Sequence, residues 1–249
     1  MFQGLFNYDN PVWRFIGKLG DLILLNILWV VCSLPVFTVG ASTTAMYYVT
    51  LKLARDEDDS TIKSFFRSFK ENFKQATAIW LIALAAGGVI LFDLWFFSTG
   101  QMSVSGNVKN VMTAVFGGCL ILYVFIITYV FPLQARFYNP VKRTILNAFF
   151  ISIRHLFQTI GMIAMDVLIV LGGWFSLFYF PQLGILLYLF GVPLIAFVNS
   201  YLLNAIFKRY MPKEEANRGD TEMRPLFEEE DEETKKALEG LKNGGSGQE

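Results

Sequence analysis

Four polar residues lie within apolar stretches, and they are the ones whose types could do chemistry in a hydrophobic setting: Asp166, Asn26, Asn199 and Asn204. Asp166 is the deepest, ten residues into the run that starts at Leu156. A charge in hydrocarbon is costly, so such a carboxyl needs a role or a partner. It could relay a proton, bind a polar substrate or pair with another subunit. It could equally be protonated and hydrogen bonded to a neighbouring helix, and the sequence leaves these alternatives open.

Other patterns for catalysis or metal binding are missing from the sequence. Asp21 and Asp93 lie nearer the ends of their apolar runs. The single histidine, His155, cannot by itself make a metal site. Cys32 and Cys119 lie in different runs without paired spacing, which predicts neither a disulfide nor a zinc site. Without a phosphate loop, HExxH or GxSxG motif, we expect no enzymatic activity, no cofactor and no nucleic-acid partner.

The elements that carry these residues are long enough to cross a bilayer. Hydrophobic residues make up 54% of the chain, and the mean hydropathy is +0.44. A spanning helix needs roughly 20 apolar residues. Four runs reach this length: 76–97, 111–131, 156–180 and 183–207. A single such run could be a buried core helix. Four in one small chain predict an all-α, polytopic protein of the lipid bilayer.

A further apolar stretch, 19–53, is broken near its middle. One spanning helix would leave its second half unexplained, so we favour two short spans, 19–34 and 36–53, arranged as a hairpin. Small and hydroxyl-bearing residues at the junction predict a tight turn followed by a closely packed helix: Pro35, Thr38, Gly40, Ser42 and Thr44.

An internal repeat supports a bundle of about six spans in three hairpins. Residues 65–74 and 149–158 share aromatic residues at helical spacing and a basic residue near one end, and 13–19 is a looser copy. Such amphipathic stubs suit the cytoplasmic interface, each leading into a hairpin. We expect one transmembrane domain over residues 1–210.

Basic residues predict the orientation. With both termini inside, fifteen flank the spans on the inner side, against Lys109 alone outside: Arg14, Lys18, Lys52, Arg55, Lys63, Arg67, Lys70, Lys74, Arg136, Lys142, Arg143, Arg154, Lys208, Arg209 and Lys213. A five-span alternative with the N-terminus outside gives thirteen against three. Both arrangements place the C-terminus in the cytoplasm of a bacterial cell.

Packing signals occur within the spans. Paired glycines predict close helix–helix approach at three places: Gly87 with Gly88, Gly117 with Gly118, and Gly172 with Gly173. Pro193 should kink the last span or leave a carbonyl free. Aromatic residues around Trp95 and Trp174 are typical of an outer membrane-interface belt, although such a cluster could also stack on a sugar.

The last segment, 211–249, changes composition sharply. Residues 213–249 hold twelve acidic and six basic residues, which predicts a mostly disordered cytoplasmic tail. An apolar island before the acidic run has the form of a docking peptide, although a solvated tail without a partner is an equal alternative: Arg224, Pro225, Leu226 and Phe227.

Several of these motifs resemble the YesL-like family of bacterial integral membrane proteins. The resemblance rests on Asn26–Trp29, Ser33–Ser42, Thr44–Tyr47 and 65–75, and more loosely on Phe131–Phe137. The family is similar in size and layout and supplies no catalytic or ligand residues. Its genes commonly lie beside carbohydrate ABC importers, which implies an accessory role in sugar uptake.

Two functions of different classes follow. The first is a non-catalytic accessory subunit that binds the permease of a carbohydrate ABC importer and assists its assembly or regulation. The second is a stand-alone transporter or channel, in which Asp166, the asparagines and the Pro193 kink would line the path.

Overall fold

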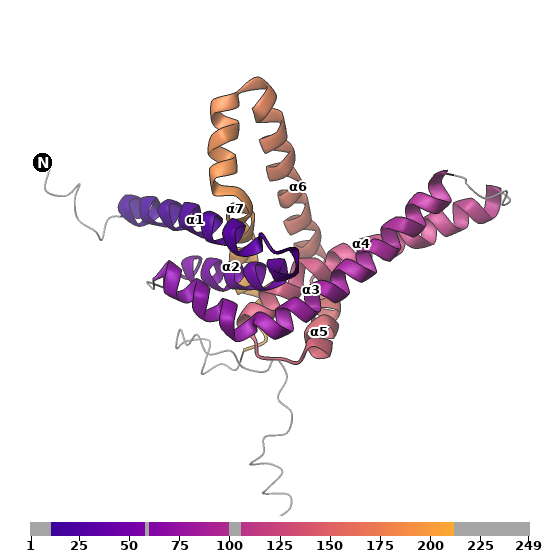
Figure 1. The fold of residues 1–249 in the computed structure, drawn as a ribbon, viewed down its shortest axis with the longest axis horizontal. Helices are drawn as coiled ribbons and strands as arrows, with labels where there is room; N and C mark the ends of the chain where they lie inside the picture. Colours follow the sequence, from indigo (N-terminus) through magenta and orange to yellow (C-terminus); the bar gives the residue numbers. More distant parts are fainter. Residues whose placement is uncertain (1–10, 58–59, 100–105, 212–249) are drawn as a thin grey trace, which may run out of the picture.

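The computed structural model describes residues 11–57, 60–99 and 106–211, and these form helices joined by short turns (Figure 1). In chain order the elements are α1 (Pro11–Ser33), η1 (Val36–Thr38), α2 (Val39–Leu53), α3 (Thr61–Thr99), α4 (Gly106–Arg136), α5 (Val141–Arg154), α6 (Leu156–Tyr179) and α7 (Pro181–Phe207). Five of these described helices, α1, α3, α4, α6 and α7, are long and apolar enough to cross a membrane. The structure therefore agrees with an all-helical membrane protein.

The predicted span 36–53 is not of spanning length. Its helical part, α2, has 15 residues, which at 1.5 Å per residue gives about 22 Å, short of the roughly 30 Å hydrocarbon layer. All but three of its residues are buried. α2 packs against α1, α3, α4 and α7 and forms the centre of the molecule. Instead of the six predicted spans, the described residues contain five helices of spanning length around the short buried helix α2. Composition alone does not distinguish a membrane span from a helix that is enclosed by other helices.

The amphipathic stubs are only partly separate elements. Residues 65–74 belong to α3, which runs without interruption from the stub into the span. Residues 149–158 straddle the end of α5 and the start of α6, and the helix breaks at His155, whose φ and ψ are −110° and 42°. Thus α5 is a distinct amphipathic helix, whereas the stub at residues 65–74 is the first part of the 39-residue helix α3.

Two long hairpins diverge from a common base (Figure 1). The α3–α4 hairpin and the α6–α7 hairpin point in different directions, while α2, α5 and the inner halves of the long helices meet at the base. The hairpins are joined where the Tyr129 hydroxyl of α4 lies 3.0 Å from that of Thr159 on α6. Large buried side chains gather at the base, among them Tyr129, Phe65 and Phe207.

Polar contacts tie the first part of α1 to the turn after α2. The Lys18 ammonium lies 2.6 Å from the Asp56 carboxylate, and Thr61 donates a hydrogen bond of 2.7 Å to Asp21. The hydrogen bond from Lys18 holds the pKa of Asp56 below its ordinary value. The start of α1 therefore lies at the same end of the molecule as the α2–α3 turn, as a helical hairpin at residues 19–53 requires.

Candidate functional site

Helix α7 is broken near its middle. Gly191 has φ 53° and ψ −141°, which is not helical, and Pro193 follows two residues later. Proline has no N–H, so the carbonyl of Leu189, four residues before it, loses its helical partner. The predicted disruption of this span is confirmed. Gly191 was not predicted as part of the break, although the Gly-Val-Pro order is a signal that could have indicated it.

Asn26 of α1 fills the gap in α7. Its Nδ2 donates to the carbonyl of Leu189 at 3.0 Å and lies 3.3 Å from that of Tyr188. A free carbonyl in the membrane would be costly, and this side chain removes the cost. Gly191 allows the approach, because a Cβ there would collide with the Asn26 carboxamide.

A polar cluster lies on the C-terminal side of the break in α7. Asn199 of α7 donates a hydrogen bond of 2.8 Å to Asp166 of α6. The Tyr47 hydroxyl of α2 lies beside this pair, where it interacts electrostatically with Asp166 and by hydrogen bonding with Asn199. Asp166 therefore has a partner from another helix, as the structural alternative required, and this contact does not exclude a functional role. Tyr47 belongs to the Thr44–Tyr47 motif, but the sequence did not predict its position beside Asp166 and Asn199.

Further polar contacts join α2 to α7 beyond this cluster, toward the C-terminal end of α7. The Ser200 hydroxyl donates to that of Thr50 at 3.0 Å. Asn204 donates to the carbonyl of Leu51 at 3.0 Å and accepts a hydrogen bond of 3.0 Å from Arg55. Asn204, predicted as an intramembrane polar residue, thus fixes the end of α2 to α7.

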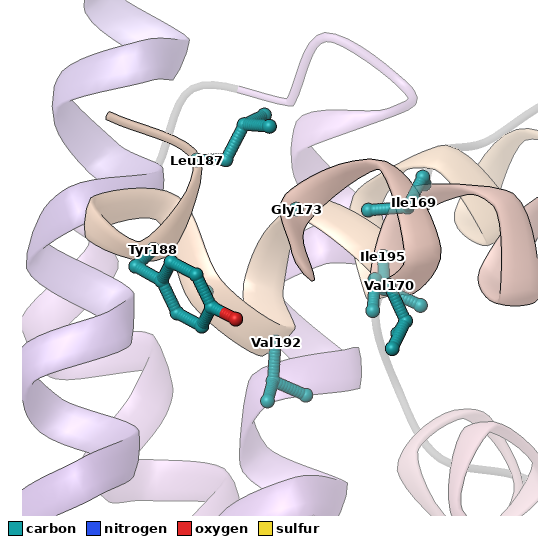
Figure 2. Close-up of a pocket in the computed structure, with 8 residues that line it drawn as sticks. Ile169, Val170, Gly173, Leu187, Tyr188, Val192 and Ile195 are labelled. Atoms are coloured by element: carbon teal, nitrogen blue, oxygen red, sulfur yellow. The ribbon is translucent and has the colours of Figure 1, made fainter. Parts of the chain in front are cut away.

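An apolar cavity of ≈200 Å³ lies between α6 and α7, beside the break. Figure 2 shows side chains from both helices around it, with α6 and α7 each contributing part of the wall. Its lining residues are Ile169, Val170, Gly173, Leu187, Tyr188, Gly191, Val192 and Ile195.

The residues at the α1–α2 junction build a structural turn. The Thr38 hydroxyl donates to the carbonyls of Cys32 and Pro35, both at 2.6 Å, and Ser42 donates to the Thr38 carbonyl at 3.1 Å. Gly40 lies directly against the Ala76 carbonyl of α3. Thr44 is fully buried, and its hydroxyl has no hydrogen-bond partner among the described residues. These residues position α2 rather than present groups to a ligand.

Gln134, part of the Phe131–Phe137 motif, is the centre of a buried polar network. Its Nε2 donates to Asn72 at 3.0 Å and to Gln75 at 2.8 Å, and its Oε1 accepts from Thr144 at 3.1 Å. The network joins α3, α4 and α5 at the base of the molecule. The motif contained this residue, but sequence alone did not show its partners.

We expect Gln134→Leu to lower the free energy of unfolding by about 1–3 kcal/mol, because it leaves buried partners of Gln134 unsatisfied. Equilibrium unfolding in mixed detergent micelles measures the change. Gln158→Leu, at a half-buried glutamine of α6, is the matched control and should be close to neutral. Equal stability of the two variants would contradict a structural role for the network.

The glycine pairs behave differently from the prediction. At Gly87 a Cβ would lie 2.8 Å from the hydroxyl of Tyr123 on α4, which is close approach as expected. At the other five positions no described atom lies within 4 Å of such a Cβ, so the described part of the chain does not pack closely there: Gly88, Gly117, Gly118, Gly172 and Gly173. The prediction was wrong for these five as contacts within the chain, because glycine pairs in sequence do not specify which helix approaches them.

The cysteines and the histidine have structural surroundings only, and the predicted docking peptide lies outside the described residues. Cys32 and Cys119 are free, and His155 lies 3.1 Å from the Tyr210 hydroxyl. In the described ranges, no group of three or more His, Cys, Asp or Glu residues could hold a metal ion. The docking-peptide residues lie outside the described residues: Arg224, Pro225, Leu226 and Phe227.

These features define a helical membrane protein with a buried central helix and one interrupted span. Residues 22–94 match the family model described as "Protein of unknown function, DUF624", a region that runs from α1 into α3. The chain is 28% identical to the uncharacterized protein YesL of Bacillus subtilis strain 168 over 147 residues, covering 57% of this chain and 67% of YesL.

A second relative from the same organism is the uncharacterized protein YteU. It is 25% identical over 202 residues, covering 81% of this chain and 80% of YteU. No solved structure matches the chain significantly. The matches confirm the resemblance that the motifs indicated: the chain is similar to the YesL-like family.

Proposed function

We propose that this protein is a non-catalytic accessory membrane subunit that packs its hairpins against the transmembrane helices of a partner. The divergence of the α3–α4 and α6–α7 hairpins is the observation that carries the proposal (Figure 1). Away from the base, each hairpin has apolar side chains that no other part of the described chain covers, such as Leu91 on α3 and Leu168 on α6. These surfaces are available to lipid and to partner helices.

The uncovered glycines favour a protein partner over lipid alone. Gly117 and Gly118 on α4 and Gly172 on α6 have open space where a Cβ would stand. Helices associate in lipid mainly through close packing, which small residues permit. We propose that helices of the partner fill these positions.

The resemblance to the YesL-like family suggests the class of partner. It implies the permease of a carbohydrate ABC importer, so we propose an assembly or regulatory role in the bacterial cytoplasmic membrane. The basic ends of the helices and the acidic tail would lie in the cytoplasm. The N-terminus would lie there as well, because the Lys18–Asp56 ion pair brings the end of the short helix α2 back to the side where α1 begins.

Co-purification tests this proposal. Gly117→Leu combined with Gly118→Leu, and separately Gly172→Leu, should reduce recovery of the importer permease with the tagged protein by at least about tenfold, equivalent to 1.4 kcal/mol. The reason is that a leucine side chain would hold a partner helix away. Extraction is in mild detergent from cells that express both proteins at matched levels.

Gly161→Leu is the matched control, because Gly161 of α6 also has nothing within 4 Å of its Cβ position but stands alone. It should leave recovery unchanged. Recovery of the tagged protein without any permease, or full recovery with the glycine-pair variants, would contradict the accessory role.

The broken helix α7 favours a second candidate, a stand-alone small-solute transporter or channel. Interrupted helices with polar groups near the membrane midplane form the binding sites of many transporters, and here the break at Gly191 lies near the Asp166–Asn199 pair. Solute uptake by the purified protein alone in liposomes would favour this function over the accessory role.

A further inference from the structure

We propose that the seam between α6 and α7 binds a small amphiphilic amine, with its apolar part in the cavity and its ammonium group at Asp166 and Asn199. The site lies between the two helices of the α6–α7 hairpin, and its lining residues Val170 and Tyr188 are partly exposed on the hairpin surface. Its test is independent of the accessory role, because it uses the protein purified without a partner.

The cavity and the polar pair lie along the same faces of the two helices. On α6, Asp166 precedes the lining residues Ile169 and Val170 by three and four positions, which is one helical turn. On α7, Asn199 follows the lining residue Ile195 by four positions. The 2.8 Å hydrogen bond between Asn199 and Asp166 therefore joins α6 and α7 about one helical turn from the cavity, on the side toward the C-terminal end of α7.

The cavity is walled by α6 and α7 and is open to the surface beside the exposed residues Val170 and Tyr188. The volume of the cavity nevertheless limits the apolar part of the ligand. Its volume is ≈200 Å³, and a dry protein cavity of about 150 Å³ accommodates benzene. Gly173 and Gly191 contribute no side chains, which leaves this space open, and the other lining residues are aliphatic apart from Tyr188. A single phenyl group or a short alkyl chain fits the volume and the lining.

The polar end of the seam offers hydrogen-bond acceptors. Asn199 is 1% exposed. Its Nδ2 donates to Asp166, and among the described residues its Oδ1 has no hydrogen-bond partner, although the Tyr47 hydroxyl also interacts with Asn199. No described basic residue forms an ion pair with Asp166. A buried acceptor without a donor is unfavourable, and charge-assisted hydrogen bonds are the strongest kind. An ammonium group supplies both the missing donors and the opposite charge.

Binding of 2-phenylethylamine tests the proposal. Equilibrium dialysis of the radiolabelled probe against the purified full-length protein in detergent, with empty micelles as background, should give saturable binding of about one molecule per chain. Asp166→Asn should weaken it about tenfold or more, because the charge-assisted hydrogen bond is lost. Gly173→Leu should weaken it similarly, since Gly173 lines the cavity and the position of a Cβ there is open.

Matched controls separate the site from general partition into the protein. Asp93→Asn, at a half-buried carboxyl of α3, and Gly172→Leu, at the neighbouring glycine outside the cavity, should bind like the unmodified protein. 2-Phenylacetate, which has the same ring and a negative charge, should not bind above background. Ile195→Phe, which narrows the cavity from α7, replaces Gly173→Leu if that variant fails to fold.

Four results would overturn the proposal. The first two are the absence of saturable binding to the unmodified protein, and unchanged binding by folded Asp166→Asn together with a folded cavity-filling variant. The third is equal binding of 2-phenylacetate, and the fourth is equal binding of the uncharged 2-phenylethanol, which would show that the ring alone is recognised. Failure of the permease to co-purify would leave the outcome of this assay unaffected.

Discussion

Replacing Gly40 by alanine is expected to destabilise the protein by about 3 kcal/mol and to reduce the yield of folded material strongly. A Cβ at this position would collide with the Ala76 carbonyl and lie 2.5 Å from the Trp80 Cβ. Both belong to α3, and one is backbone, so relief requires the two helices to separate. Overpacking of this kind costs about 1–3 kcal/mol or more. Equilibrium unfolding in mixed micelles and the monodisperse yield after extraction measure the effect.

The position of the contact explains why the effect should be large. Trp80 also donates a hydrogen bond of 2.7 Å to the Val36 carbonyl, so moving α3 away from α2 disturbs the turn as well as the helix crossing. Gly118→Ala is the control, because nothing lies within 4 Å of its Cβ position. Alanine should there be neutral or stabilising by up to about 1 kcal/mol. Similar stability of Gly40→Ala and Gly118→Ala would show that α2 and α3 do not approach closely.

Gly191→Ala is expected to lower the free energy of unfolding by about 2–3 kcal/mol. Its φ of 53° and ψ of −141° lie where residues with a side chain are strained, at a cost of about 1–3 kcal/mol. The new methyl group would also collide with the Asn26 carboxamide. The variant either keeps the break under strain or expels Asn26 from it. Equilibrium unfolding measures the loss.

A double-mutant cycle separates the two causes. Asn26→Ala alone should cost about 1–3 kcal/mol, because the carbonyls at the break lose their donor. In the double variant Asn26→Ala/Gly191→Ala the collision is absent, so the combined loss should be smaller than the sum. An additive result would mean that Asn26 and Gly191 do not meet. Gly161→Ala, with open space at its Cβ position, serves as the control.

The class of protein and most of its helices follow from the sequence. Long apolar runs predict spanning helices from local composition alone. Three of the four predicted runs lie wholly within α3, α4 and α7, and the fourth extends one residue beyond the end of α6. The disruption at Pro193 was predictable for the same reason, since the missing N–H is a property of the residue itself.

Only the tertiary structure decided what α2 is. Residues 36–53 have the composition of a short span, yet the neighbouring helices enclose α2 on most of its surface. Enclosure depends on how α3, α4 and α7 pack, and no local pattern contains that information. The same holds for the glycine pairs, of which only Gly87 meets a neighbouring helix.

The candidate site shows the same division. Asp166, Asn26 and Asn199 were conspicuous in sequence because polar groups are rare in hydrocarbon. Their partners were not, since Asn26 reaches a carbonyl 163 positions away and Asn199 meets Asp166 across 33 positions. Local composition places polar residues within helices, whereas the pairing of helices brings these groups together, since each satisfies its hydrogen bonds with whatever the packing places beside it.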